Sequence, residues 1–354
     1  MHGLRVTKSP AEIELLKQAI AITDAGFRRV LKFTQPGVYE HEVEAELAHE
    51  FIRGRGKFAY SPIIASGVNA CTLHYNSNDQ VCRDGDLLLL DVASSYANYN
   101  ADLTRTIPVN GHFTPRQRDV YNAVLRVMRG SIAGATVGKL HRDWQKEAQA
   151  MMNDELVQLG LITAADVANQ NPEDPACRKY FMHGLGHPLG LDVHDVGFTN
   201  QPFAPGWVLT VEPGIYIPAE GFGVRLENDI LVTEHGPVDL MDSIPVEADD
   251  IERLATLNAY DWASVEPSIF GTLFERTLAI GLKKADRRAL SLGDRLLDPR
   301  EHGQADLLHA PDGAVGARLL HRLDHDGLAV CASLGSVPDV TTASRLAGLG
   351  AAHL

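Results

Sequence analysis

Apolar residues near the amino terminus recur three, four or seven positions apart, at Ile13, Leu16, Ile20, Phe27 and Leu31. This spacing predicts an amphipathic helix. The stretch "SPAE" supplies its start, because Ser9 can cap the helix while Glu12 completes a capping box. Pro36 and Gly37 end this helix, and "YEHEVEAELAHEFIRGRG" predicts a second, more polar one.

After Gly56 the pattern changes to short apolar runs bounded by Gly, Asn and Asp, which predict strands. These runs are "SPIIASG", "DLLLLDVAS" and "LTRTIPV". The same order then returns, with helices in "TPRQRDVYNAVLRVMRGSIAG" and "KLHRDWQKEAQAMMNDELVQLG" and strands in "WVLTVEP", "GVRL" and "NDILVTE". Helix, helix, strands thus occurs twice, about a hundred residues apart. The order predicts two similar αβ halves with strands inside and helices outside, in the α+β class.

The last part of the chain differs from the rest in its composition and hydrophobic pattern. No Phe, Tyr or Trp occurs after Phe274. Helical patches in residues 262–354, such as "ADRRALSLGDRLL", are weakly apolar. We therefore expect two domains, one over residues 1–261 and an appendage over 262–354 that is poorly folded or fused. No function is assigned to the appendage.

Composition narrows the class of protein. Of the 354 residues 45% are hydrophobic, which suffices for a core, and the net charge of −14 argues against nucleic acid or an anionic membrane as partner. The four cysteines (Cys71, Cys82, Cys177, Cys331) form no C-x-x-C pair, which favours a reduced compartment. With neither a signal-peptide pattern nor a run of roughly 20 apolar residues, the expected location is the cytoplasm.

Four acidic residues interrupt or end apolar strands. Asp91 ends "LLLLD" and Asp102 opens "DLTRTIPV", with the turn-like "YANYN" between them. Glu212 and Glu227 occupy corresponding places in "WVLTVEP" and "GVRLENDIL". Each could be a simple turn or edge acid. Four carboxylates buried together, however, would repel one another, and a pair of divalent cations would relieve that repulsion.

The segment "FMHGLGHPLGLDVHDVG" adds nitrogen ligands to this set. Its glycines allow close backbone approach, and His187 is the best candidate for a metal ligand. His183 and His194 would then lie nearby, as groups that bind substrate or handle protons, although any one of the three could be structural. Oxygen-dominated ligation with one imidazole favours Mn²⁺, while Co²⁺, Fe²⁺ or Zn²⁺ could also bind.

The stretches "HGLGHPLGLDVHDVG", "LTVEPGIYI" and "GVRLENDILVT" closely resemble the proline-specific branch of the pita-bread metallopeptidases, over roughly residues 9–254. The family's five ligands, in the order Asp, Asp, His, Glu, Glu, match Asp91, Asp102, His187, Glu212 and Glu227. The resemblance implies the pita-bread (creatinase/aminopeptidase) fold, with two pseudo-symmetric αβ halves around a curved, mainly antiparallel sheet.

The resemblance also implies roles for further residues. The position that matches His74, in "TLHYN", would lie beside the metals and help to stabilise the reacting peptide. Positions matching His183 and His194 would contact the substrate and the tetrahedral intermediate. Tyr216 would bind substrate from the "EPGIY" turn. Arg225 would support the site from outside the set of metal ligands. Glu212 would also carry a proton to the leaving nitrogen.

The activity implied is cleavage of the amino-terminal Xaa-Pro bond of peptides by a hydroxide that bridges two metal ions, as in Xaa-Pro aminopeptidases. Two alternatives stay open: an Xaa-Pro dipeptidase (prolidase) and a non-enzymatic pita-bread protein that binds a partner. Relatives of this branch usually carry an amino-terminal domain that this sequence lacks, so a truncated product is a further reading. A homodimer is compatible with the resemblance.

Overall fold

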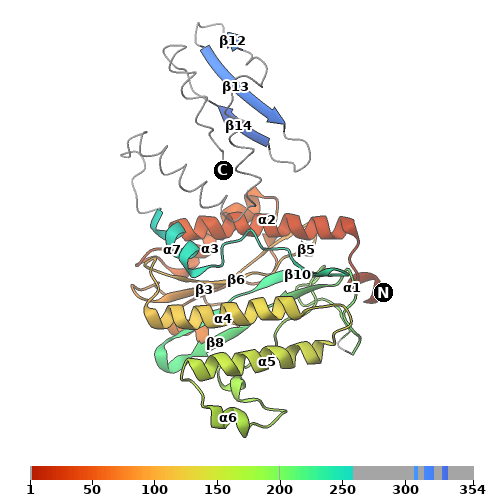
Figure 1. Ribbon diagram of the computed structural model, residues 1–354. Helices are drawn as coiled ribbons and strands as arrows, with labels where there is room; N and C mark the ends of the chain where they lie inside the picture. Colours follow the sequence, from red (N-terminus) through yellow and green to blue (C-terminus); the bar gives the residue numbers. More distant parts are fainter. Residues whose placement is uncertain (1, 199, 258–306, 310–314, 323–328, 334–354) are drawn as a thin grey trace, which may run out of the picture. The chain divides into compact units, whose positions relative to one another are not determined.

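A computed structural model of the chain describes residues 2–198, 200–257, 307–309, 315–322 and 329–333 (Figure 1). By its internal contacts the chain divides into two units, residues 1–260 and 261–354, which we describe separately. That residues 262–354 are a poorly folded or fused appendage stays a prediction.

The helices and strands of the first unit follow in chain order. The helices are α1 (His2–Val6), α2 (Pro10–Phe33), α3 (Glu40–Arg53), α4 (Pro115–Gly134), α5 (His141–Gln158), α6 (Ala164–Ala168) and α7 (Ala248–Leu257), with 3₁₀ turns η1 (Gly67–Cys71), η2 (Ala176–Lys179) and η3 (Pro218–Glu220). The strands are β1 (Lys57–Phe58), β2 (Ile63–Ser66), β3 (Leu87–Asp91), β4 (Ser94–Tyr96), β5 (Tyr99–Asn100), β6 (Thr104–Pro108), β7 (Val208–Val211), β8 (Gly214–Ile217), β9 (Phe222–Arg225), β10 (Asn228–Thr233) and β11 (Gly236–Asp239).

The helix starts expected from the sequence are confirmed. At the start of α2 the Ser9 side chain accepts from the Glu12 backbone N–H, and the Glu12 carboxylate accepts from that of Ser9. Thr114 and Gln117 form the same capping box at α4. Each box satisfies backbone N–H groups that the first helical turn leaves without partners.

The first half consists of α2 and α3 over the antiparallel sheet β2–β3–β6. The four leucines of β3 are each at most 1% exposed, which explains why that strand reads as a continuous apolar run. The expected hairpin is present, because β4 pairs with β5 around Ala97 and Asn98, both at positive φ. The hairpin returns the chain from Asp91 toward Asp102.

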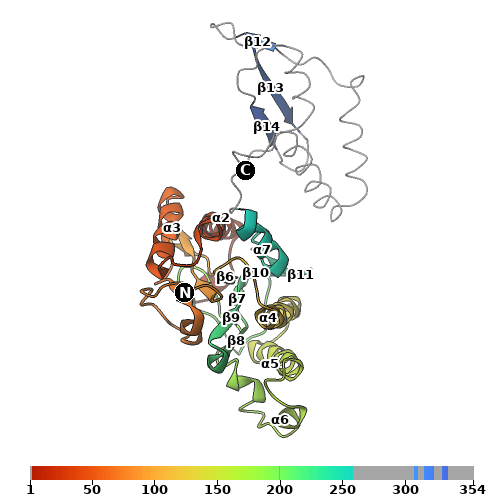
Figure 2. The ribbon, with the colours of Figure 1, turned by 90° about the vertical axis from the view of Figure 1, so that its left-hand side faces the viewer.

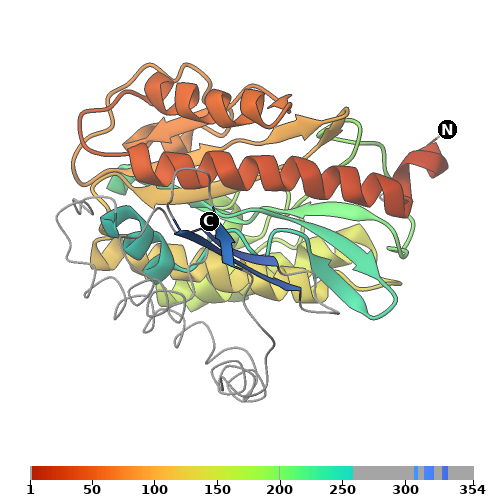
Figure 3. The ribbon, with the colours of Figure 1, turned by 90° about the horizontal axis from the view of Figure 1, so that it is seen from above.

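The second half repeats this plan with α4 and α5 and the antiparallel sheet β7–β10–β11. In Figure 2 and Figure 3 the pair α2 and α3 lies on one side of the strands, and α4 and α5 lie on the other. The predicted arrangement, with strands inside and helices outside in an α+β fold, is therefore confirmed. Strand β9 corresponds to the expected run "GVRL", whereas its partner β8 and the short α6 were not expected from the sequence.

The two halves join along β6. Thr104 of β6 pairs with Asp91 of β3 on one side and bridges to Glu227 on the other. Arg105, fully buried, donates to the backbone oxygen of Glu227 at 2.7 Å and to the side chain of Asn228 at 2.8 Å. Candidate acids from both halves consequently meet along β6, where the two sheets join, and we call this junction the seam.

In the second unit the described residues form the antiparallel strands β12 (Leu307–His309), β13 (Val315–Arg322) and β14 (Ala329–Ser333). The weakly apolar helical patch expected at "ADRRALSLGDRLL" lies outside the described residues. Among the described helices, none is both long and apolar enough to cross a membrane.

Candidate functional site

A cavity of about 630 Å³ opens at the seam between the two halves. Nine of the ten residues singled out in the sequence line it: Asp91, Asp102, His187, Glu212, Glu227, His74, His183, His194 and Arg225. The tenth, Tyr216, is fully buried behind the cavity wall and contacts His183 and Arg225. Direct contact with the substrate was expected for Tyr216. Its buried position instead favours a role in supporting His183.

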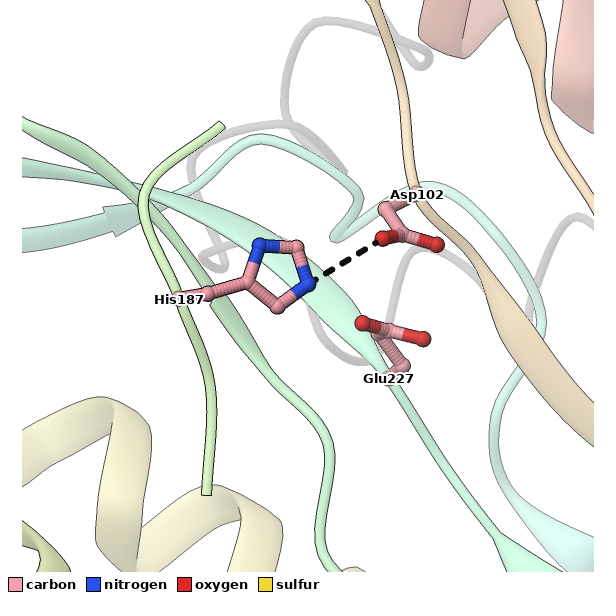
Figure 4. Close-up of side chains that lie close together, drawn as sticks. All are labelled: Asp102, His187 and Glu227. Carbon is pink, nitrogen blue, oxygen red and sulfur yellow. Dashed lines mark ion pairs between the residues drawn. The ribbon is translucent and has the colours of Figure 1, made fainter. Parts of the chain in front are cut away.

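Asp102, His187 and Glu227 form the tightest cluster. Each offers one ligand atom, and these atoms all lie within 4.8 Å of one another. Figure 4 shows the three side chains pointing toward one another from separate segments, with His187 Nε2 3.5 Å from Asp102 Oδ2. Burial alone would lower the pKa of His187, but Asp102 and Glu212 outweigh it and raise that pKa to about 9.

His187 is placed by a close backbone approach. Its carbonyl accepts from Thr210 N of β7 at 2.9 Å, and its own N–H donates to the Thr210 hydroxyl at 3.1 Å. A Cβ on the preceding Gly186 would lie 2.0 Å from the Thr210 carbonyl oxygen. Only glycine fits there, which gives a physical reason for one glycine of the "HGLGH" stretch.

Asp91 faces the cluster with both oxygens engaged. Arg225 donates to Asp91 Oδ2 at 2.6 Å, and Tyr60 Oη lies 2.7 Å from Asp91 Oδ1. The same Tyr60 hydroxyl lies 2.6 Å from Asp102 Oδ1. Because a hydroxyl has one proton, it can donate to only one of these carboxylates at a time. Burial raises the pKa of Asp91, and the charge of Asp102 adds to this, against the opposing effect of Arg225.

Glu212 bridges the cluster and the histidines. Its Oε1 lies 3.7 Å from His187 Nε2, and its Oε2 lies 3.9 Å from His183 Nδ1. Burial raises the pKa of Glu212 to about 7, against the lowering effect of His187 and Arg225. Burial also raises the pKa of Glu227 well above its usual range, and the charges of Asp102 and Glu212 raise it further.

His183 is held by a chain of hydrogen bonds. Arg225 donates from Nη1 to the Tyr216 hydroxyl at 2.8 Å, so this hydroxyl is left to donate to His183 Nε2, also at 2.8 Å. His183 Nδ1 then donates to the carbonyl oxygen of Gly184 at 2.8 Å. Burial, with the charge of Arg225, lowers the pKa of His183 to about 4, which keeps the ring neutral near pH 7.

The loop that carries His74 is organised by Glu40 at the start of α3. The Glu40 carboxylate is fully buried and accepts from the Tyr75 hydroxyl at 2.7 Å and from Ser66 N at 2.8 Å. It also accepts from Gln80 N at 3.0 Å. These bonds tie both ends of the loop to one point, and Tyr75 follows His74 directly.

The donor set fits divalent metal ions. Glu227 Oε1 is buried without a hydrogen-bond partner among the described residues, and three carboxylates besides it face the same cavity. Unpaired buried carboxylates are costly, and a cation coordinated by them removes that cost. Four carboxylates and one imidazole suit a hard or borderline dication. That these five residues are metal ligands stays a prediction.

Three supporting residues were missed by the sequence reasoning. Tyr60 contacts both aspartates, Thr104 donates its hydroxyl to Glu227 Oε2 at 2.7 Å, and Asp229 accepts from Asp102 N at 3.1 Å. Asp229 lies two positions after Glu227 in "ENDIL", so it was visible as another acid in an apolar strand. Tyr60 and Thr104 carry no such signal, because their roles arise from pairing across the fold.

Comparison with known proteins shows the family to which the chain is related. The model of metallopeptidase family M24 matches residues 14–234. Over 267 residues the chain is 42% identical to an Xaa-Pro aminopeptidase of Haemophilus influenzae and 40% identical to one of Escherichia coli. Each alignment covers 72% of this chain, and they cover 62% and 60% of the two relatives. The chain therefore spans about three fifths of the length of these relatives.

Solved structures give the same result for the fold. Zinc-substituted Escherichia coli aminopeptidase P in complex with product superposes with a TM-score of 0.69 at 39% sequence identity, over 73% of this chain and 61% of that one. Proline aminopeptidase P II from Yersinia pestis superposes with a TM-score of 0.67 at 39% sequence identity, over 72% of this chain and 62% of that one. A family match over more than half of the chain, together with relatives at about 40% identity, establishes the relationship. The chain belongs to metallopeptidase family M24 and has its pita-bread fold.

Proposed function

We propose that this chain is a two-metal Xaa-Pro aminopeptidase, which removes the first residue from peptides with proline in second place. The observation that carries the proposal is the convergence of five candidate ligands and three histidines on one cavity. The relatives named Xaa-Pro aminopeptidase support the substrate class. Mn²⁺ is the metal we propose, because carboxylate oxygens dominate the donor set.

Asp102, His187 and Glu227 would hold the metal centre, with Asp91 and Glu212 completing it from either side. When bound, the two ions would polarise the scissile carbonyl and lower the pKa of a water molecule toward neutrality. Arg225 fixes the orientation of Asp91 through its 2.6 Å hydrogen bond.

The remaining side chains would bind the peptide and move protons. Glu212 reaches toward both His187 and His183, and we assign it proton transfer to the leaving nitrogen. His194 and His74 line the same cavity and would donate hydrogen bonds to the oxygen that gains charge in the transition state. His183, neutral and fixed by Tyr216, would orient the substrate.

The direct test is peptide cleavage by the full chain, stripped of metal and reloaded with Mn²⁺. Ala-Pro-Phe should release free alanine, whereas Ala-Ala-Phe should stay largely intact. Cleavage of other amino-terminal bonds while Ala-Pro-Phe stays uncut would refute the proposal. Cleavage of the dipeptide Ala-Pro but not of the tripeptide would instead identify a prolidase.

A matched pair of variants tests the metal centre. Asp102→Asn should lower kcat by about 100-fold or more and reduce the bound metal below about two ions per chain. Asp174→Asn removes an exposed carboxylate whose side chain is 72% accessible, and it should change neither quantity. Equal metal content in the two variants would contradict the assignment of Asp102.

The cytoplasmic location and the homodimer stay predictions.

A further inference from the structure

Buried charges tie the segment that carries His194 to the amino terminus of the chain. We call residues 190–195 the histidine loop. Asp195 Oδ2 lies 3.6 Å from Lys8 Nζ, and both side chains are only 1% exposed. Arg5 donates to Asp195 Oδ1 and, at 2.6 Å, to Asp192 Oδ2. Asp195 therefore carries two basic partners from residues 5–8.

The backbone of the histidine loop is packed onto this ion pair. A Cβ on Gly190 would lie 2.3 Å from Asp195 Oδ2 and 3.0 Å from Lys8 Nζ, so a side chain there would displace the ion pair. Asn100 donates its backbone N–H to Gly190 O and its side chain to Leu191 O, both at 2.9 Å. Asn100 stands two residues before the candidate ligand Asp102, so the loop is tied to the metal centre as well.

His194 itself has little to hold it. Its ring lines the cavity, and its centroid lies 4.2 Å from that of His187. Among the described residues, however, the His194 imidazole has no hydrogen-bond partner. The place of the ring therefore depends on its contact with His187 and on the backbone, which is anchored at the adjacent Asp195.

A buried ion pair is a costly way to anchor a loop. Apolar residues of similar volume often stabilise a fold as well or better, so stability alone does not account for this buried pair. A displacement of about 1 Å at a catalytic group can cost about 100-fold in rate. Fixing the position of His194 is an effect of that kind.

We propose that Lys8 and Arg5 are positioning residues, which act through Asp195 to hold His194 where it contacts the reacting peptide. The amino-terminal residues 5–8 thereby act on the candidate site without lining its cavity. The proposal rests on the proposed function for its effect on rate. Its structural part, that these two residues hold the histidine loop in place, does not depend on that function.

The test is a double-mutant cycle with the Mn²⁺-loaded chain and Ala-Pro-Phe. Lys8→Met should lower kcat by about tenfold or more while KM changes by less than about threefold. In a His194→Ala background the same substitution should have little further effect, because its consequence passes through His194. Lys17→Met serves as the control, since Lys17 forms an exposed pair with Glu14 on α2. It should leave kcat unchanged in both backgrounds.

Arg5 provides a second, safer variant, because its side chain is 30% exposed and Asp195 would keep Lys8. Arg5→Met should lower kcat in the same sense, and Arg5→Lys should restore part of it. An unchanged kcat in both the Lys8→Met and Arg5→Met variants, or an equal loss with and without His194, would overturn the proposal.

Hydrogen exchange separates this proposal from the proposed function. Amides of residues 189–196 should exchange faster in Lys8→Met or Arg5→Met than in the parent chain, while those of α4 and α5 should not. If the parent chain cuts no Xaa-Pro peptide, the proposed function fails, yet faster exchange still supports the anchoring of the loop. Unchanged exchange overturns it whatever the activity.

Discussion

Glu40 shows how much one buried side chain can decide at the scale of a residue. Its carboxylate meets four donors of the segment 66–80, including the hydroxyl of Tyr75, the residue next to His74. Hydrogen bonds to a carboxylate are short and strong, so a carboxylate that accepts several of them fixes those donors in place. The position of the loop residue His74 therefore depends on a residue of helix α3.

Tyr75→Phe tests this dependence. The substitution keeps the ring but removes the bond to Glu40, so stability should fall by about 1 kcal/mol and kcat on Ala-Pro-Phe by about tenfold, with little change in KM. Tyr121→Phe is the matched control, because the buried Tyr121 hydroxyl donates to Val246 O, away from the cavity. It should cost similar stability and leave kcat intact. Equal kcat in both variants would argue against a role for Glu40 in placing His74.

Glu212 makes a second prediction at this scale, for the metal-stripped protein. Burial raises the pKa of Glu212 from 4.5 to about 7, so the folded state binds a proton that the unfolded state releases. The contribution of this bound proton to the free energy of unfolding is complete below about pH 4.5. It is lost as the pH rises through about 7 and Glu212 ionises in the folded state. The Tm of the stripped protein should therefore fall between pH 5 and pH 8.

Glu212→Gln provides the control for this pH dependence. The amide does not titrate, so the fall in Tm between pH 5 and pH 8 should become shallower in the stripped variant. A Tm that rises with pH over this range in the parent chain, as measured by differential scanning calorimetry, would contradict the prediction.

At the scale of elements, β6 is the strand that joins the two sheets. Its Arg105 is fully buried and makes four hydrogen bonds, to Pro245 O, Thr104 O, Glu227 O and Asn228 Oδ1. Two of these acceptors, Glu227 O and Asn228 Oδ1, lie where β9 passes into β10, and Glu227 is itself a candidate ligand. A single side chain of the first half thus fixes the backbone of the second half at the candidate metal site.

Arg105→Met should be severely destabilising. It leaves several buried acceptors unpaired, each worth about 1–3 kcal/mol, so a loss of roughly 3 kcal/mol or more is expected. Arg53→Met, which removes a side chain that is 75% exposed, should cost less than about 0.5 kcal/mol. Urea denaturation measures both values. A loss for Arg105→Met as small as that for Arg53→Met would show that these bonds contribute little.

At the scale of the whole first unit, the site exists because two similar halves face each other. Asp91 ends β3 and Glu212 follows β7, while Asp102 and Glu227 precede β6 and β10. Each half delivers two acids at equivalent places, and neither half alone can build the cluster. Without a cation these acids repel one another across the seam, so metal binding and the stability of this unit should be coupled.

Metal loading should consequently raise the Tm of the stripped chain. At free Mn²⁺ about 100 times its Kd, each occupied site adds about 2.7 kcal/mol to the free energy of unfolding. Asp102→Asn should respond much less, since it removes a ligand from the tightest cluster. The measurement is the Tm with Mn²⁺ and with a chelator. Equal shifts in the parent and in Asp102→Asn would place the stabilising metal elsewhere.

The sequence by itself determined the local features. Capping boxes at Ser9 and Thr114, the buried leucine strand and the hairpin around Ala97 and Asn98 all follow from short-range rules of backbone geometry and burial. The acids at strand ends and the histidine segment were conspicuous because a charge in an apolar run is costly and needs a reason.

Only the tertiary structure decided which groups face one another. Tyr60, Thr104, Glu40 and the pair Lys8 and Asp195 reach the site through contacts between residues 31 to 187 positions apart along the chain, and no local pattern encodes such pairings. Likewise Tyr216, expected at the substrate, lies behind His183 because the ribbon β8–β9 packs its ring inward. Local preferences act over a few residues, whereas the position of a side chain in a site is set by packing across the whole fold.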